Sequence, residues 1–473
     1  MSEKRVVQPG FVGKPDGFPF LWGVATSAHQ IEGNNKASDW WDWESKGFIE
    51  GGVRSGAATD HLNRFKEDIQ LAADLGVNSY RFSVEWARIE PEQGRFDQVA
   101  LDWYLELIHE CEKKGILPMV TLHHFSSPKW FAEAGGFTSE SSPNLFLNFV
   151  KQVVRKIGGR VPLWCTFNEP LVLVIGSYLG KFMPPAEFSP RNAAKACHFL
   201  LKSHVGAYDY LHTSSYSSVK RQGPWRNIPL SVGIAHNMID LLPDRSWHPI
   251  EQILARKLRW FYNQSWLDAI NGRPQRFEIP FLFPKMAQVK EAIGRKTTDF
   301  IGINYYTKGY LRWRPRDQER DHLADELPIN VSFSRRLEET TDMGWSIHSA
   351  GLSKMLKAVS SYKLPIFITE NGIADREDKL RTSYILAHLI EIAKSHPIDV
   401  RGYFYWSLID NFEWIKGFGP RFGLYHINYD NFQRTLRASA LNFKEIIHAH
   451  KDVELGQPNL QILERMRDNF KSR

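Results

Sequence analysis

The chain has 473 residues, of which 42% are hydrophobic and 24% are charged, and its formal net charge is +7. This composition is typical of a packed globular protein with one large core or a few ordinary domains, and it excludes a disordered or low-complexity chain. Basic and acidic residues are interleaved even in the densest charged stretch, at 311–326, so the net charge does not indicate a nucleic-acid partner.

The N-terminus and the cysteines predict a cytoplasmic protein. Charged residues, Pro and Gly interrupt residues 1–18 before a secretory signal can form, and no apolar run is long enough to predict a membrane span. Cys111, Cys165 and Cys197 are odd in number and form no CxxC motif, which indicates neither a disulfide framework nor a zinc site. We therefore expect free thiols, no metal and no other cofactor, and we leave the oligomeric state open.

Eight short apolar or β-branched runs recur along the chain, and each ends in polar residues. They are FLWGVAT (20–26), NSYRFSV (78–84), LPMVTLH (117–123), PLWCTFN (162–168), LSVGIAHN (230–237), FIGINYY (300–306), PIFITEN (365–371) and VRGYFYWSL (400–408). Segments with apolar residues at three- and four-residue spacing lie between them, for example 61–76 and 98–115. Strands that alternate with amphipathic helices predict an α/β fold, and eight such units favour a closed (β/α)8 (TIM) barrel.

The spacing of these units indicates one elaborated barrel across residues 1–473, with its core at 17–450. No glycine-rich G-x-G-x-x-G follows the first run, which argues against an open dinucleotide-binding sheet. There is no long Ser/Pro/Gly linker and no fixed repeat. The longest connections include 212–226 and 311–340, and since loops after barrel strands form the rim, we expect them to shape the entrance.

Functional polar residues are expected at the C-terminal ends of the strands, because these ends converge on one mouth of a barrel. In chain order they are Gln30, Glu32, Arg81, Glu85, His123, His124, Asn168, Glu169, Asn237, Asn304, Tyr305, Tyr306, Glu370, Asn371, Trp406, Asp410, Glu413 and Trp414. For Glu32, Glu85, His123, Asn237 and Asp410, a structural hydrogen bond is about as expected as a ligand contact.

Glu169 and Glu370 end the fourth and seventh runs, nearly opposite each other in a ring of eight strands. Taken alone, Glu169 could equally cap a helix, because Asn-Glu-Pro is an ordinary strand-to-helix turn. Together, two facing carboxylates are what glycosidic cleavage requires, and a separation of roughly 5 Å permits direct attack with retention of configuration. The surrounding amides and imidazole can bind sugar hydroxyls, and Trp can stack on the sugar.

Four ordered motifs resemble family one of the glycoside hydrolases, the β-glucosidase-like retaining enzymes. They are FLWGVATSAHQIEG (20–33), TFNEP (166–170), ITENG (368–372) and WSLIDNFEWIKGFGPRFGLYHINYD (406–430). The resemblance implies an enzyme that hydrolyses terminal non-reducing β-D-glucosyl residues, and also β-galactosyl or β-fucosyl residues, through a covalent glycosyl-enzyme. The expected ligands are small β-glycosides or short oligosaccharides.

Position by position, the resemblance implies that Glu169 is the acid/base and Glu370 the nucleophile, contacted by Arg81 and Tyr306. The substrate-binding residues that it implies are Gln30, His124, Asn168, Asn304, Tyr306, Trp345, Trp406, Glu413, Trp414 and Phe422. We expect Arg81 to lower the pKa of Glu370, whereas burial and the charge of Glu370 raise the pKa of Glu169.

Phe125 departs from the family pattern, because many relatives have a Trp after the histidine that corresponds to His124. The change removes an indole N–H and leaves open which sugar is preferred at one hydroxyl. Glu413 favours an unphosphorylated sugar, since a carboxylate repels phosphate. The alternatives are a transglycosylating enzyme, a catalytically weak carbohydrate-binding barrel and, remotely, an open-sheet oxidoreductase.

Overall fold

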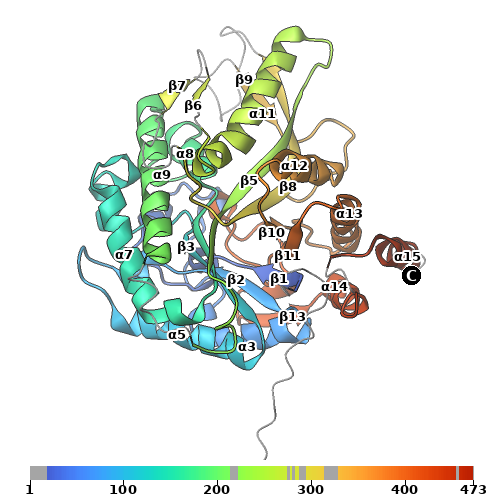
Figure 1. The fold of residues 1–473 in the computed structure, drawn as a ribbon, viewed down its shortest axis with the longest axis horizontal. Coiled ribbons are helices and arrows are strands. Elements are labelled where there is room, and N and C mark those ends of the chain that lie inside the picture. Colours follow the sequence, from blue (N-terminus) through green and yellow to red (C-terminus); the bar gives the residue numbers. More distant parts are fainter. Residues whose placement is uncertain are drawn as a thin grey trace, which may run out of the picture.

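A closed barrel of parallel strands forms the centre of the molecule (Figure 1). The computed structural model describes residues 19–213, 222–273, 277–279, 283–286, 294–313, 329–453 and 457–471. The barrel strands are β1 (Leu21–Ala25), β2 (Ser79–Ser83), β3 (Leu117–His123), β4 (Leu163–Asn168), β5 (Ser231–Pro243), β8 (Phe300–Trp313), β10 (Ile366–Asn371) and β11 (Val400–Trp406). Each pairs with the next in parallel, and pairing of β8 with β10 and of β11 with β1 closes the ring. The predicted (β/α)8 barrel is confirmed.

Two strands run further than the sequence pattern predicts. β5 and β8 continue as a pair to Pro243 and Leu311, beyond the polar residues Asn237 and Tyr306, at which the sequence pattern predicts the strand ends. A ninth strand, β9 (Ile329–Ser332), adds to β8 in the antiparallel direction. The extension projects beyond the barrel beside α11 (Pro249–Ile270), at the top of Figure 1. The polar residues interrupt the apolar run without ending the strand.

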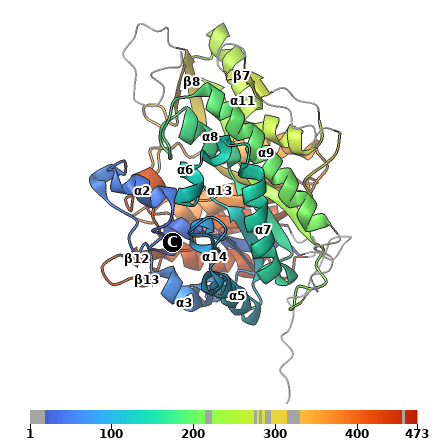
Figure 2. The same cartoon turned by 90° about the vertical axis from the view of Figure 1, so that its left-hand side faces the viewer.

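Amphipathic helices cover the outside of the barrel. They are α3 (His61–Asp74), α5 (Gln98–Lys113), α7 (Ser142–Ile157), α9 (Pro190–His212), α11, α12 (Ala350–Ser360), α13 (Arg381–Lys394) and α14 (Ala438–Ala449). In α7, Phe146, Phe149, Val150 and Val153 are buried, the spacing of one helical face. Figure 2 shows α7 and α9 side by side on one flank of the barrel.

Shorter elements complete the fold. The additional helices are α1 (Ala28–Ile31), α2 (Asp39–Ser45), α4 (Trp86–Ile89), α6 (Lys129–Glu133), α8 (Pro170–Tyr178) and α15 (Leu460–Lys471), and the additional hairpins are β6 (Phe277–Ile279) with β7 (Phe283–Met286) and β12 (Tyr425–Asn428) with β13 (Gln433–Leu436). In the described ranges, no helix combines the length and apolar character needed to cross a membrane. Residues 1–18, 214–221 and most of the charged stretch at 311–326 lie outside those ranges.

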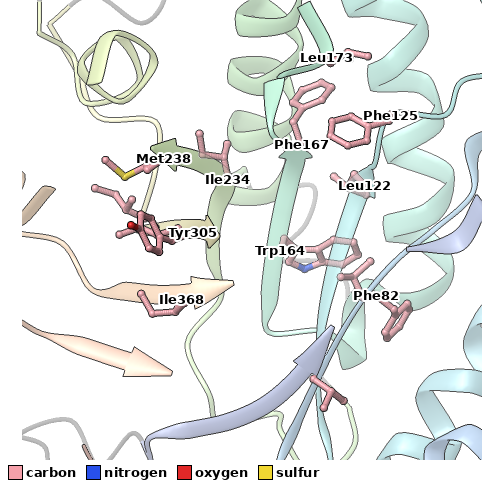
Figure 3. Close-up of a cluster of buried hydrophobic side chains, with 14 of the residues drawn as sticks. Phe82, Leu122, Phe125, Trp164, Phe167, Leu173, Ile234, Met238, Tyr305 and Ile368 are labelled. Atoms are coloured by element: carbon pink, nitrogen blue, oxygen red, sulfur yellow. The ribbon is translucent and has the colours of Figure 1, made fainter. Parts of the chain in front are cut away.

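Successive side chains of each strand point alternately into and out of the barrel, which produces two separate cores. The outer core lies between strands and helices; Figure 3 shows Trp164 and Leu122 there. The inner core includes Leu163, Phe300 and Phe404. Apolar residues thus fill the interior, and polar side chains replace them at the C-terminal ends of the strands. All three cysteines are buried free thiols, as predicted.

Candidate active site

A cavity of about 500 Å³ opens at the C-terminal ends of the strands, and both Glu169 and Glu370 line it. Glu169 directly precedes Pro170, the first residue of α8, and its backbone is left-handed, with φ 45° and ψ 57°. Its side chain makes no capping hydrogen bond to the helix. The capping alternative is therefore excluded, and this conformation, unfavourable for a residue with a Cβ, directs a carboxyl group to the cavity.

Both carboxylate oxygens of Glu370 accept hydrogen bonds from buried donors. Arg81 Nη1 lies 2.5 Å from Glu370 Oε1, and the hydroxyl of Tyr306 lies 2.6 Å from Oε2. Arg81 is fully buried, and its Nη2 also donates to Asn168 Oδ1 at 2.7 Å. The guanidinium therefore fixes the positions of Glu370 and Asn168 together and supplies a positive charge next to Glu370.

Glu169 has only neutral partners. Asn304 Nδ2 and Asn237 Nδ2 donate to the same oxygen, Glu169 Oε1, at 2.8 and 3.1 Å. The hydroxyl of Tyr262 donates to Asn237 Oδ1 at 2.7 Å and thereby orients the amide so that it can donate to Glu169. Because both amides act on Oε1, Oε2 is the oxygen of Glu169 that is left to carry a proton.

The two carboxyl groups differ in their charged surroundings. Burial raises the pKa of Glu169 to about 8, the charge of Glu370 adds to this rise, and the two amides oppose it. Burial also raises the pKa of Glu370, while Arg81 and the hydrogen bond from Tyr306 oppose that rise. The expectation of a lowered pKa for Glu370 is therefore wrong, because desolvation outweighs the guanidinium. Glu370 is still the carboxyl with a cationic partner, so it is the one that ionises first.

Glu413 adds a third carboxyl to the cavity. Burial and the charges of Glu370 and Glu169 raise its pKa to about 8. Gln30 Nε2 lies 3.4 Å from Glu413 Oε2 and also donates to the carbonyl of Phe412 at 2.9 Å. Gln30 was predicted to contact the sugar, but it does not line the cavity. It instead holds Glu413, which does.

A neutral histidine is packed between amide and indole groups. His124 Nε2 accepts from Asn168 Nδ2 at 3.1 Å, so the ring proton lies on Nδ1. Nδ1 is buried and has no partner among the described residues. Burial, aided by the charge of Arg81, holds the pKa of His124 well below its usual value. Trp406 and Trp414 stack near the ring, with centroids 5.8 and 6.0 Å away. His124 is therefore a neutral ring held against Asn168 and the two indoles at the wall of the cavity.

A second group of rings forms another part of the wall. Tyr306, Trp345 and Phe422 lie with ring centroids 5.8 to 6.4 Å apart. Of the predicted substrate-binding residues, those that line the cavity are His124, Asn168, Tyr306, Trp345, Trp406, Glu413, Trp414 and Phe422. Asn304 and Arg81 lie behind this lining and hold the carboxyl groups.

Most of the weaker predicted candidates have structural partners instead. Glu32 bonds to Arg88 and Tyr104, Glu85 to the backbone of Ala87, His123 to Ser127, and Asp410 to Arg437. Asn237 is the exception, because it contacts Glu169. Two supporting residues were missed: Tyr262, and Thr369, whose hydroxyl donates to Asn304 Oδ1 at 2.7 Å. Thr369 could have been found from its position beside Glu370; Tyr262 has no such signal.

Phe125 lies between two cavities. It lines the main cavity and also an adjacent one of about 290 Å³, and its ring meets Trp414 edge-on at a centroid distance of 5.2 Å. Its backbone φ is +67°, in the left-handed region.

Among the described residues, no group of three or more His, Cys, Asp or Glu side chains is placed to hold a metal ion. The arrangement combines a cation-paired carboxylate and a protonated carboxyl in one cavity, the pair needed for nucleophilic attack with acid assistance.

Comparison with known proteins gives consistent matches over nearly the whole chain. Residues 15–452 match the model of glycosyl hydrolase family 1. β-Glucosidase A from Acetivibrio thermocellus is 31% identical over 461 residues, covering 90% of this chain and 97% of the relative. A β-glycosidase structure from Pyrococcus horikoshii has a TM-score of 0.80 and 37% identity, covering 97% and 98% of the two chains. The β-glucosidase from Thermotoga maritima in complex with deoxynojirimycin has a TM-score of 0.80 and 31% identity, covering 92% and 99%.

Proposed function

The chain belongs to glycosyl hydrolase family 1 and is a retaining β-glycosidase, and we propose that Glu169 is its acid/base and Glu370 its nucleophile. The observation that carries this assignment is the difference between their partners. Glu370 accepts from the Arg81 cation, whereas Glu169 accepts from neutral amides only. A nucleophile must be ionised and a general acid must be protonated at the same pH, and the two environments favour that combination.

In the first step, a carboxylate oxygen of Glu370 attacks the anomeric carbon of a bound β-glycoside. The bond from that carbon to the leaving oxygen breaks, and Glu169 transfers its Oε2 proton to this oxygen. Arg81 and Tyr306 hold the attacking group in position. The products are a glycosyl ester on Glu370, with inverted configuration, and a neutral alcohol.

In the second step, Glu169 changes role. Once Glu370 is an ester it carries no charge, so one of the causes that raise the pKa of Glu169 is removed. Glu169, now ionised, takes a proton from water as the water oxygen attacks the anomeric carbon. The ester bond breaks, Glu370 leaves as a carboxylate, and the second inversion restores the β configuration.

The proposed substrates are small β-glycosides with an unmodified terminal sugar. His124, Asn168 and Glu413 offer polar groups for hydroxyls, and Trp406 offers a ring face. Glu413 lies where an added phosphate on the sugar would meet a further carboxyl group. β-Glucosides are the first expected substrates, with β-galactosides and β-fucosides next. The barrel would act as the single catalytic domain of the chain.

The test of these roles is rescue by azide. Glu370→Gly should hydrolyse p-nitrophenyl β-glucoside at least 1,000-fold more slowly, on the order of what loss of a nucleophile removes, and azide should restore turnover with an α-glucosyl azide as product. Glu169→Gly should retain the first step with this good leaving group and give the β-glucosyl azide. Proton NMR separates the two anomers.

Glu85→Gly is the matched control, because Glu85 is also a buried glutamate after a barrel strand but does not line the cavity. It should form no glycosyl azide. If Glu370→Gly kept wild-type turnover, or if the two variants gave the opposite anomers, the assignment would be overturned.

A further inference from the structure

A second cavity, of about 290 Å³, lies beside the catalytic cavity, on the flank of the barrel that carries α2, α6, α8 and α9 (Figure 2). Helix α8 stands between the two cavities: Leu173 and Ser177 line the second one, whereas Val172 and Ile175 line the catalytic one. Of the described lining residues, Phe125 is the one that both cavities share. The volume is near the lower end of the roughly 300–1,000 Å³ that small-molecule sites occupy. The second cavity is therefore a separate space large enough for a small ligand.

A carboxylate on the wall of this second cavity, called the Asp39 cavity below, has one oxygen that the protein does not use. The backbone N–H groups of Trp40 and Ser127 both donate to Asp39 Oδ1, at 2.8 and 2.9 Å. Asp39 Oδ2 has neither a hydrogen-bond partner nor an ion-pair partner among the described residues. The two N–H groups thus hold the carboxyl group in place and leave Oδ2 free to accept from a ligand.

Two hydroxyl groups in the same wall are also unused. Ser177 is 2% exposed and Tyr178 is 8% exposed, and both line the Asp39 cavity. Neither hydroxyl has a hydrogen-bond partner in the part of the chain that the structure describes. Because polar groups of buried side chains normally have partners, two such hydroxyls beside a free carboxylate oxygen indicate a place where a ligand supplies the missing bonds.

The charges around the Asp39 cavity have one sign. Asp39 and Glu187 line it, and its described lining includes no Lys, Arg or His. Glu187 accepts from the neutral amide of Asn192, at 2.9 and 3.1 Å. Burial raises the pKa of Tyr178, and the negative charges of Glu187 and Asp39 add to this rise, so both carboxylates act on the unused hydroxyl. A space lined by charges of one sign attracts the opposite charge, here a cation.

The ionisation of Asp39 is linked to such a cation. Burial raises the pKa of Asp39 to about 7 against the hydrogen bonds from Ser127 and Trp40, the charge of Glu85 adds to the rise, and His29 opposes it. A positive charge beside Oδ2 favours the ionised carboxylate and offsets part of the cost of its burial.

The rest of the wall is apolar and determines what kind of cation fits. Phe131 and Phe137 line the cavity with ring centroids 5.0 Å apart, and Leu173 and Leu200 add aliphatic surface. A small hydrated metal ion would leave this surface without contact, and a sugar would bring more hydroxyl groups than the three unused polar atoms can pair. An organic cation with an apolar body satisfies both the carboxylate and the rings.

We propose that the Asp39 cavity binds a small organic ammonium ion, namely a primary amine with an aryl or branched aliphatic body. Its N–H groups donate to Asp39 Oδ2, and the hydroxyl oxygens of Ser177 and Tyr178 are the acceptors available for the others. Its apolar body packs against Phe131 and Phe137. The site is separate from the catalytic carboxyl groups, so the inference goes beyond the proposed function and does not depend on it.

The test is isothermal titration calorimetry of the wild-type protein with benzylammonium at pH 8, where Asp39 is ionised and the amine is protonated. Benzyl alcohol has the same size without the charge and should bind at least about tenfold more weakly, the value of one hydrogen bond between charged groups. Methylammonium has the charge without the ring and should also bind at least about tenfold more weakly, because it buries far less apolar surface.

Two variants locate the bound amine. Asp39→Asn keeps an Oδ1 for the N–H groups of Trp40 and Ser127 but removes the charge, and should weaken benzylammonium binding about tenfold or more. Ala196→Leu keeps the charge but fills part of the cavity, since Ala196 is a buried lining residue on α9, and it should also weaken binding.

Asp42→Asn is the matched control. Asp42 lies on α2 like Asp39, but it pairs with Lys46 and Lys129 and does not line the Asp39 cavity. This variant should bind benzylammonium as the wild type does. Circular dichroism and the melting temperature establish that each variant is folded.

The catalytic cavity also contains carboxyl groups, and the variants separate the two places. An amine bound in the catalytic cavity would keep its affinity in Asp39→Asn and in Ala196→Leu, and this result would overturn the proposal. Absence of benzylammonium binding to the wild type, or equal binding of benzyl alcohol, would overturn it as well. If Asp39→Asn does not fold, Ala196→Leu and the comparison of the three probes still decide. Hydrolysis of p-nitrophenyl β-glucoside, measured separately, tests the proposed function alone.

Discussion

Arg81 and Glu370 are 289 positions apart in the sequence and are joined by a 2.5 Å charged hydrogen bond inside the barrel. Burial of Glu370 favours its protonated form, and Arg81 opposes this. The ionisation of Glu370 therefore depends on a residue from β2, on another strand of the barrel.

Arg81→Met should raise the pKa of Glu370 and move the acidic limb of the kcat/KM profile to higher pH. Loss of a close opposite charge should raise the pKa of Glu370, and with it the acidic limb, by about 1–3 units. The activity at pH 6 should therefore fall at least roughly 10-fold. The pH dependence of p-nitrophenyl β-glucoside hydrolysis measures the shift. Arg88→Met is the control, since Arg88 pairs with Glu32 and does not line the cavity. An unmoved acidic limb in Arg81→Met would contradict the role of the guanidinium.

The positions of the two proposed catalytic carboxyls could be predicted from sequence, because Glu169 and Glu370 end apolar runs whose ends must converge in a parallel barrel. Their hydrogen-bond partners could be predicted only in part. The register of β4 against β5 shifts between Cys165 and Asn168, and this places Glu169 beside Asn237. Such a shift depends on closure of the whole barrel, and no local pattern signals it.

The direction of the pKa of Glu370 could not be predicted for a related reason. A sequence identifies a nearby cation such as Arg81, but the desolvation that opposes it depends on how tightly the surrounding strands and loops pack. The same holds for the lengths of β5 and β8, because pairing between them continues past Asn237 and Tyr306 regardless of the local polar residues.

Asn237→Ala should raise the pKa of Glu169, because it removes a donor that stabilises the ionised form. The alkaline limb of kcat/KM, set by protonated Glu169, should then move to higher pH. The fall in kcat should be larger for alkyl glucosides than for dinitrophenyl glucoside, since a poor leaving group needs more acid assistance. Tyr262→Phe should act in the same direction but more weakly, as Tyr262 acts through Asn237. An alkaline limb that moves to lower pH would exclude this role.

Glu169→Gln should stabilise the folded protein at alkaline pH while it abolishes turnover of alkyl glucosides. The pKa of Glu169 is about 8 when folded and 4.5 in its ordinary state. Between these values the unfolded chain loses the proton and the folded chain keeps it, so stability decreases as pH rises through this window and is fully present below pH 4.5. Gln has no proton to lose.

Urea unfolding of Glu169→Gln and wild type at several pH values measures this effect. The difference in free energy of unfolding should grow in favour of Gln as pH rises from about 4.5 to 8, by on the order of 5 kcal/mol, and then stay constant. Titrating groups far from Glu169 are common to both proteins, so their contributions cancel, whereas the pKa of Glu413 depends on the charge of Glu169. A difference independent of pH would show that Glu169 is not held protonated in the folded state.

Phe125 should leave the enzyme with weak discrimination between β-glucosides and β-galactosides. Its ring lines the cavity beside Trp414 but offers no hydrogen-bond donor. Inverting one sugar hydroxyl, as between glucoside and galactoside, therefore breaks no hydrogen bond to Phe125. A buried side chain that donates to a substrate hydroxyl discriminates strongly, because the wrong epimer leaves it unpaired.

Phe125→Trp supplies such a donor, and the adjacent cavity of about 290 Å³ offers space for the larger ring. The glucoside-to-galactoside ratio of kcat/KM should change by about fivefold or more, the value of one net hydrogen bond. Phe125→Leu removes the ring without adding a donor and should leave the ratio within about twofold of wild type. Equal ratios in all three proteins would place the discriminating hydroxyl away from position 125.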